Sequence, residues 1–354
     1  MKRTLALSAL TSIPFLALGT SLIAQQRSDF VSEASFVVGT YQPAKANHSP
    51  LEMAERANAF LKTLDASQVK QVRGPLGGEI RRAWTNLPAR PDADGIRMGL
   101  LNSQQAKAAC DLMASLFSKQ GYDKMVHIML ADDQLLRGGR PRRGFGTEDF
   151  SLVIFGNPSE KDPWAFQLDG HHVGVNLSIE GEKVTMSPSF IGTQPEAFKI
   201  GKKTYRPFAG EMDLAYKLAG SLTFEQLKTA IISDRRGPIR TGPGRDGRIP
   251  RKEGVSCSTF SESQKKDILK LISQWVNDLP EKQARVRMAT IEKELDQTSF
   301  AWSGDKAPRS DVSYIIQGPS LIIEYACQDL GGNPLNHLHS VYRDPTNEYG
   351  GQLK

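Results

Sequence analysis

The fold is decided in residues 164–179, which read WAFQLDGHHVGVNLSI. Two short runs in this stretch, Trp164–Leu168 and His171–Ile179, are rich in β-forming residues and are separated by an Asp-Gly pair, a pattern typical of paired strands. The neighbouring runs Phe150–Phe155 and Val184–Met186 have the same character. We therefore expect an antiparallel meander in the middle of the chain.

Helical periodicity lies on both sides of this meander. The runs that predict helices are Leu51–Leu64, Asn102–Lys119, Tyr122–Leu136, Glu211–Leu222, Thr223–Ile232, Ser261–Val276 and Glu281–Leu295. The chain ends on further strand-like runs: Thr298–Trp302, Asp311–Gln317, Leu321–Ala326 and Asn336–Arg343. Two groups of strands separated by helices predict an α+β fold. Its mixed, largely antiparallel sheet would take strands from the middle and C-terminal parts and pack against several helices.

The sequence shows neither an internal repeat nor a change of composition that would mark a domain boundary. We therefore expect residues 48–354 to form a single α+β domain. A chain of this length can bury a large core without a second domain.

The N-terminus has the three parts of a secretory signal. Lys2 and Arg3 precede the apolar stretch Leu5–Ile23, which ends at a small residue before an abruptly polar segment. An uncleaved membrane anchor is the alternative, since a spanning helix needs about 20 apolar residues. A proline and a Gly-Thr-Ser break inside the stretch favour cleavage. We expect a signal peptide over residues 1–24, an extended lead-in over residues 25–47, and a periplasmic or secreted protein with no further membrane span.

The charge and the cysteines limit the classes of partner and linkage. Removal of Lys2 and Arg3 takes the formal net charge from +6 to +4, with 43 basic against 39 acidic residues, which is too mild to favour nucleic acid as a partner. An oxidising compartment permits one disulfide or none among the three cysteines. If a bridge forms, the pair that we expect is Cys257–Cys327, with Cys110 as a buried small hydrophobic residue.

Four of the six histidines fall in two short groups, and the C-terminal group is the more informative. His337 and His339 are two residues apart in a strand-like run. In a strand, such side chains point to the same face about 6.6 Å apart. Two imidazoles on one face can bind one zinc, copper or iron ion. The alternative is that both are structural.

The second group is His171-His172, directly after Gly170. In a regular strand, His171 would share the apolar face with Val173, and His172 would share the polar face with Asn176. Because a metal site needs access to solvent, His172 is our candidate for the third metal ligand, with His171 as a supporting ligand. A bulge at Gly170 would reverse this assignment.

Charged residues near these strands supply the remaining candidates. Glu324 interrupts an apolar run, where a charge is costly unless it is paired or coordinated. We assign it as a metal ligand, a partner of a histidine or a general base, the alternative being a salt bridge to Arg343. Asp169 and Arg343 are candidates for substrate binding. The basic segments Arg137–Arg143 and Arg235–Lys252 are read as solvated surface loops or as loops over an anionic substrate.

Two longer motifs give a resemblance to a known family. They are WAFQLDGHH at residues 164–172 and NHLHSVYRDPTNEYG at residues 336–350. At these residues the chain resembles a family of secreted bacterial proteins known as a domain of unknown function. The resemblance covers roughly residue 50 to the end and implies export and a single domain, but no activity. The family's usual aspartate before the final Tyr-Gly is Glu348 here.

These observations leave two functional hypotheses. The first is an extracytoplasmic metal-dependent enzyme, a hydrolase with zinc or an oxidoreductase with copper or iron, acting on a small molecule. The second is a binding protein that holds a metal or an anionic ligand such as a glycan in the same place without chemistry. A structural role for all four histidines is the third reading.

Overall fold

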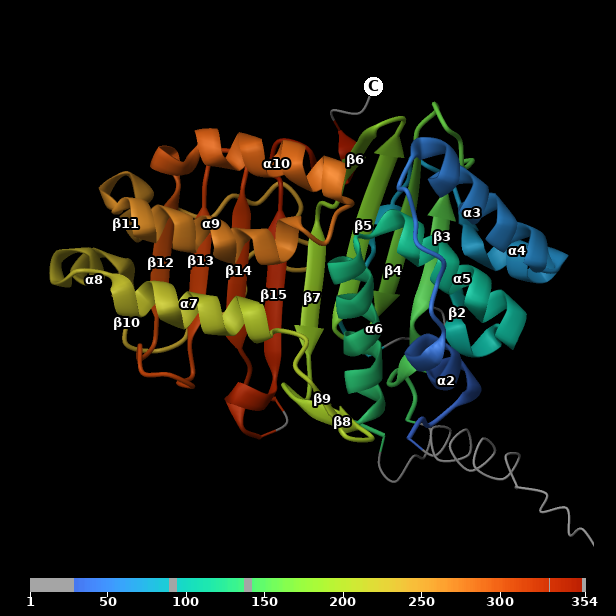
Figure 1. The fold of residues 1–354 in the computed structure, drawn as a ribbon, viewed down its shortest axis with the longest axis horizontal. Helices are drawn as coiled ribbons and strands as arrows, with labels where there is room; N and C mark the ends of the chain where they lie inside the picture. Colours follow the sequence, from blue (N-terminus) through green and yellow to red (C-terminus); the bar gives the residue numbers. More distant parts are fainter. Residues whose placement is uncertain (1–28, 89–93, 137–141, 331, 352–354) are drawn as a thin grey trace, which may run out of the picture.

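The computed structural model describes residues 29–88, 94–136, 142–330 and 332–351. The predicted signal peptide, residues 1–24, lies outside these ranges. The described chain forms a 13-stranded sheet with helices packed against it (Figure 1). The α+β prediction is confirmed, with a mixed, largely antiparallel sheet built from the middle and C-terminal parts. No helix in the described ranges is long and apolar enough to cross a membrane.

Residues 50–193 form the first half of the structure, that is, one half of the sheet and the helices that go with it. Its helices are α3 (Pro50–Thr63), α4 (Ala66–Val72), α5 (Ser103–Leu116) and α6 (Lys119–Asp133), with short 3-10 turns η1 (Ile80–Arg82), η2 (Met98–Leu100) and η4 (Thr147–Asp149). Its strands are β1 (Arg73–Gly74), β2 (Ile96–Arg97), β3 (Ser151–Phe155), β4 (Trp164–Gly170), β5 (Val173–Glu180), β6 (Lys183–Thr185) and β7 (Ser189–Thr193).

Residues 209–343 form the second half of the structure, that is, the other half of the sheet and its helices. Its helices are α7 (Ala209–Ser221), α8 (Phe224–Ala230), α9 (Glu262–Val276) and α10 (Glu281–Lys293), with 3-10 turns η5 (Cys257–Thr259), η6 (Leu295–Gln297) and η7 (Pro334–Asn336). Its strands are β10 (Ile231–Ser233), β11 (Val255–Ser256), β12 (Ser299–Ser303), β13 (Ser313–Gln317), β14 (Ile322–Cys327) and β15 (Leu338–Arg343). A separate hairpin, β8 (Phe198–Ile200) and β9 (Lys203–Tyr205), connects the halves, and the 3-10 turn η8 (Glu348–Gly350) follows β15.

The two halves repeat one architecture. The strand order β1-β3-β4-β5-β7-β15-β14-β13-β12-β10 reads the same from either edge to the centre. In each half the short first strand pairs parallel with the first long strand, and a second short strand pairs antiparallel with the same one. The central strands β7 and β15 are antiparallel, as a pseudo-two-fold axis between them requires. The structure therefore contains a repeat that is not visible in the sequence.

Equivalent side chains make equivalent bonds in the two halves. Gln68 and Gln105 each donate an amide hydrogen bond to the other, and Gln226 and Gln264 do the same in the second half. All four glutamines are the third residues of capped helices, where the side chain also accepts from the N-cap backbone. Such a buried amide pair locks the start of one helix to the start of the next.

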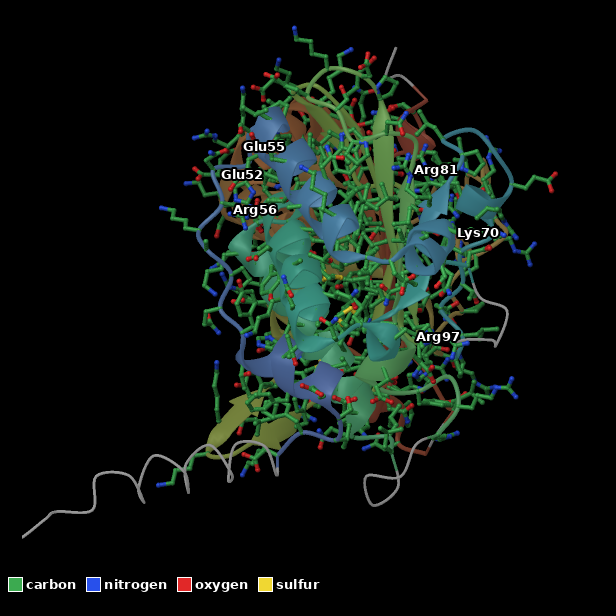
Figure 2. The ribbon with its side chains drawn as sticks, turned by 90° about the vertical axis from the view of Figure 1, so that its right-hand side faces the viewer. Glu52, Glu55, Arg56, Lys70, Arg81 and Arg97 are labelled. Carbon is green, nitrogen blue, oxygen red and sulfur yellow. The ribbon has the colours of Figure 1, made fainter. Side chains whose placement is uncertain are left out.

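Helices and loops cover opposite faces of the sheet. Helices α5 and α6 of one half and α7, α9 and α10 of the other lie over one face (Figure 1). Ser340 of β15 points to that face and accepts a hydrogen bond from Trp275 of α9. Its neighbours alternate to the other face, where Arg343 donates to the carbonyl of Thr241. In the edge view, Arg56 of α3 and Arg81 lie on opposite sides of the strands (Figure 2).

Three expected elements differ in the structure. The lead-in predicted as extended contains the helix α2 (Glu33–Thr40), because Ser32 caps it and Val37 and Val38 are buried. The helix expected over Asn102–Lys119 ends at Leu116, and Gly121 lies inside α6, where its missing side chain lets the backbone of Asp278 approach. All three cysteines are buried free thiols, so the Cys257–Cys327 bridge does not form.

Candidate functional site

Three histidines from both halves of the chain meet at one end of the sheet. His172 follows β4 of the first half, while His337 and His339 lie just before and within β15 of the second. The Nε2 atom of His337 is 2.8 Å from Nε2 of His172 and 3.0 Å from Nε2 of His339. His172 and His337 are buried, and His339 is partly exposed. We call these three residues the imidazole triad.

The position of His172 follows from a tight turn that the sequence pattern concealed. The predicted strand His171–Ile179 begins only at Val173, and His171 and His172 form the turn between β4 and β5, closed by the pair Gly170 and Val173. His172 has a positive φ of 69°. As a result the two imidazoles do not face opposite ways: their ring centroids are 3.7 Å apart with an interplanar angle of 32°.

His337 and His339 point to the same side, as their spacing suggests. His339 is paired with Gly192 of β7 across the central strand pair. A side chain at Gly192 would place its Cβ 3.0 Å from the Cδ2 atoms of both His172 and His339. The triad therefore requires glycine at this position.

The three rings are held in the neutral state. Burial lowers the pKa of His172 well below its usual value, and the neighbouring imidazoles lower it further. Burial and the neighbouring His337 and His171 lower the pKa of His339 to about 3. The pKa of His337 is also lowered, mainly by burial. Neutral imidazole is the form that binds metal ions.

A second set of possible ligands adjoins the triad. Asp132, the penultimate residue of α6, lies with its Oδ1 2.5 Å from Nδ1 of His171. The donor atoms of Asp132, His171 and His172 all lie within 4.8 Å of one another, as do those of the triad. His172 thus belongs to both groups, whereas His171 belongs only to the second. Asp132 was not a candidate from the sequence, although a carboxylate one turn after Ile128 on an apolar helix face was a signal for it.

Glu324 does not lie among the histidines. Its carboxylate accepts hydrogen bonds from the backbone nitrogens of Arg240 and Thr241, at 3.0 and 2.8 Å, and from the Thr241 hydroxyl at 2.6 Å. Arg343 is not among the groups that donate these hydrogen bonds to Glu324. The carboxylate is therefore occupied in holding the loop that crosses this face of the sheet.

Of the two candidate substrate residues, Arg343 is buried and Asp169 is half-buried. Arg343 is fully buried and binds the carbonyls of Thr241 and Gly242 together with the carboxylates of Asp246 and Glu348. The carboxyl group of Asp169 is shielded from solvent, and this desolvation raises its pKa to about 8. Neither presents a free charged group at the triad.

The two basic segments, Arg137–Arg143 and Arg235–Lys252, are the remaining candidates from the sequence. Residues 137–141 lie outside the described part of the chain, and the guanidinium of Arg142 stacks 3.8 Å from the centroid of the Phe145 ring. The segment Arg235–Lys252 fastens to the sheet through Glu324 and Arg343, and its Arg245 and Arg248 are exposed. This loop is thus both a structural cover and a basic surface.

Fold and site define an α+β protein with two similar halves and a histidine-rich site at their junction. The chain belongs to the family described as a protein of unknown function (DUF3500), whose model matches residues 47–351. Searches of curated proteins and of solved structures found no match.

Proposed function

We propose that this protein binds a divalent metal ion through His172, His337 and His339 outside the cytoplasm and uses it to activate water for hydrolysis. The observation that supports this proposal is that the Nε2 atoms of His172 and His339 both lie next to Nε2 of His337. Zinc–nitrogen bonds of about 2.0–2.1 Å in tetrahedral geometry place ligand nitrogens on the order of 3.3 Å apart. The distances of 2.8 and 3.0 Å are within a few tenths of an ångström of that value.

The proton positions favour a cation at the centre. Nδ1 of His337 lies 2.5 Å from the carbonyl oxygen of Leu330, which can only accept, so this nitrogen carries the proton. The neutral ring then has one lone pair on Nε2, and the Nε2 atoms of His172 and His339 both face it. One N–H can use that lone pair, but two cannot. A metal ion bound by all three nitrogens removes this conflict.

The ligand set points to water activation. Three neutral imidazoles leave the full charge of a divalent ion uncompensated, and such an ion lowers the pKa of bound water toward neutrality. A divalent ion held by His172, His337 and His339 would supply an activated water, so the site would need no separate carboxylate base. This agrees with the position of Glu324, whose carboxylate already accepts hydrogen bonds from the loop at Arg240 and Thr241.

The extracytoplasmic location rests on the N-terminal sequence. Residues 1–24 carry the basic start, the apolar stretch and the small-residue end of an export signal. Mass spectrometry of the protein recovered from a periplasmic extract or culture medium should show an N-terminus near Gln25. A product that retains the apolar stretch would contradict export by a cleaved signal.

A binding protein without turnover is the second candidate, and the burial of the triad favours it. His172 is 1% exposed and His337 is 5% exposed, and His339 is the one partly exposed member of the triad. A substrate larger than a few atoms has little room at such a centre. Retention of one metal ion with no hydrolysis of any ester or phosphodiester would favour this reading.

Metal content of the exported protein, purified without chelator or histidine tag, tests the proposal. We expect about one zinc ion per chain, lost in the His337→Ala/His339→Ala double variant. His127→Ala is the matched control, since His127 of α6 packs against the ring of Tyr205 of β9 and should leave the metal in place. Hydrolysis of p-nitrophenyl acetate should follow the metal. A folded wild-type protein that binds no zinc, copper or iron would overturn the proposal.

A further inference from the structure

The carboxylate of Asp132 lies deep in the protein, with the imidazole of His171 as its basic neighbour in the described part of the chain. Asp132 is 1% exposed, and its oxygens accept from Nδ1 of His171 and from the backbone nitrogen of Gly146, at 2.5 and 2.6 Å. Among the described residues, no lysine or arginine lies within ion-pair distance of it. Burial accordingly raises the pKa of this carboxyl. A buried carboxylate is usually paired or bound to a metal.

The ring of His172 offers a second nitrogen on its other side. Its Nε2 faces His337, while its Nδ1 is buried and has no hydrogen-bond partner among the described residues. An unpartnered polar atom in a side chain that is 1% exposed needs an explanation. A ligand shared with His171 and Asp132 would provide one, since one donor atom from each of these three residues lies within 4.8 Å of the others.

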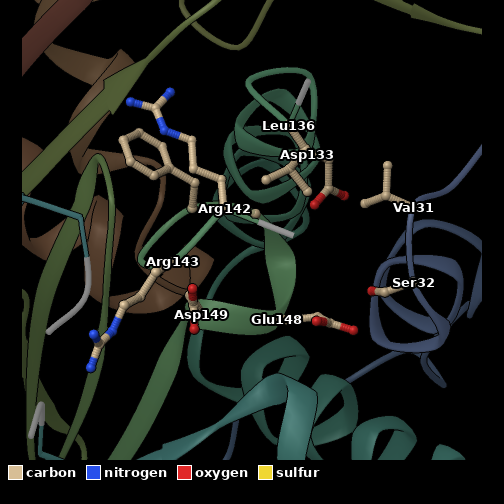
Figure 3. A pocket seen from close by; sticks show the side chains of 10 residues that line it. Val31, Ser32, Asp133, Leu136, Arg142, Arg143, Glu148 and Asp149 are labelled. Carbon is tan, nitrogen blue, oxygen red and sulfur yellow. The ribbon is translucent and has the colours of Figure 1, made fainter. Parts of the chain in front are cut away.

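A surface cavity near His171 offers a route from solvent to the group formed by Asp132, His171 and His172. The cavity, about 250 Å³, lies at the end of α6 and is lined by Asp133, Arg142 and Arg143 (Figure 3). Phe145 also lines it, and the centroid of the Phe145 ring is 4.6 Å from that of His171. One aromatic side chain therefore separates the cavity from His171.

We propose that Asp132, His171 and His172 form a second cation site, so that His172 bridges two metal ions. The inference rests on the proposed function, because the first ion occupies the triad. Two imidazoles and one carboxylate are a ligand set suited to Mn²⁺ or Fe²⁺, whereas three imidazoles suit zinc. The second ion replaces the proton shared by Asp132 and His171 and the ring proton of His172, and both protons are released to solvent.

Manganese titration of zinc-loaded protein, followed by electron paramagnetic resonance, tests the second site. We expect one bound Mn²⁺ per chain with nitrogen couplings from imidazole. Asp132→Asn should weaken Mn²⁺ binding at least about tenfold while one zinc ion remains. Asp133→Asn is the matched control, a neighbouring buried carboxylate that hydrogen-bonds Ser35 and Thr147 instead of a histidine. His339→Ala should lose zinc and keep Mn²⁺.

The outcomes separate the two proposals. Zinc bound without Mn²⁺, or Mn²⁺ binding that survives Asp132→Asn, overturns the second site and leaves the triad standing. Failure to bind zinc overturns the triad and the bridged pair together. If Asp132→Asn does not fold, the wild-type spectrum decides, because bound Mn²⁺ without nitrogen couplings is not held by His171 and His172.

Discussion

At the scale of single residues, the site depends on a missing side chain as much as on the histidines. Gly192 lies on the strand next to His339, close to the rings of His172 and His339. A methyl group added to its Cα would touch both rings and the carbonyl of Leu338. The spacing of His337 and His339 could be predicted from the sequence. The need for glycine on the partner strand could not, because that pairing joins residues far apart in the chain.

Gly192→Ala should therefore separate the imidazoles. The new Cβ would lie 3.0 Å from both rings and 2.8 Å from the Leu338 oxygen, so the rings must shift. We expect zinc affinity to fall at least about tenfold, with about 1–3 kcal/mol lost from the free energy of unfolding. Isothermal titration calorimetry and chemical denaturation measure the two effects. Gly220→Ala on α7, where nothing lies within 4 Å, is the control; equal zinc affinity in both variants would contradict the account.

The cysteines make a prediction that depends on pH. Burial raises the pKa values of Cys110 and Cys257 to about 12, so at pH 8 only about one thiol in 10⁴ is ionised. We expect no reaction of the folded protein with a disulfide reagent at pH 8 and three thiols per chain after unfolding. Because the unfolded thiols ionise near pH 9, the free energy of unfolding should fall as the pH rises above 9. One thiol after unfolding would instead show a bridge.

At the scale of elements, the loop over residues 237–250 holds its place through buried charged groups of the sheet. Glu324 of β14 binds its backbone at Arg240 and Thr241, and Arg343 of β15 binds the next carbonyls at Thr241 and Gly242. These two charged side chains lie within strands that are otherwise buried. Their charge serves to fasten a loop, which explains why each interrupts an apolar pattern.

Glu324→Gln separates this role from catalysis. The amide keeps one acceptor oxygen but turns the other into a donor that faces the N–H groups of Arg240 and Thr241. We expect a loss of about 1–3 kcal/mol in the free energy of unfolding and an unchanged zinc stoichiometry of one. Denaturation and metal analysis of the same sample measure both. Loss of zinc in a fully stable variant would restore Glu324 as a ligand.

The elements show what local pattern predicts and what it misses. The helix over residues 262–276 follows from a serine cap and apolar spacing, and the structure confirms it. The alternating run at His171–Ile179 predicted a strand through both histidines, but the chain turns there because β4 pairs with β5 up to Gly170. Strand β7 was not expected because Ser189–Thr193 is short and follows Pro188, and its place is set by pairing with β15.

At the scale of the whole molecule, the imidazole triad exists only because two similar halves meet. The β4–β5 turn brings His172 from one half, and β15 brings His337 and His339 from the other. The halves repeat element order and a few bonds, such as the two glutamine pairs, while loop lengths and most residues differ. This is why the repeat could not be found in the sequence, and why the junction of the halves could not be predicted.

A buried lysine joins the same two halves. Lys124 of α6 lies 2.8 Å from both Glu211 of α7 and Asp278, and all three are almost fully buried. Lys124→Met should leave two buried carboxylates without a cation and cost about 3–5 kcal/mol in the free energy of unfolding. Lys119→Met, whose ammonium pairs with Asp123 on the surface, should cost less than about 1 kcal/mol. Equal losses in chemical denaturation would contradict a role for Lys124 in joining the halves.

The central claim, a metal ion held by the imidazole triad, is tested most directly by anomalous X-ray diffraction at the zinc edge on crystals of the protein. The account predicts a peak about 2.0–2.1 Å from the Nε2 atoms of His172, His337 and His339. Zinc bound only elsewhere on the chain, with the three Nε2 atoms still in contact, would contradict it.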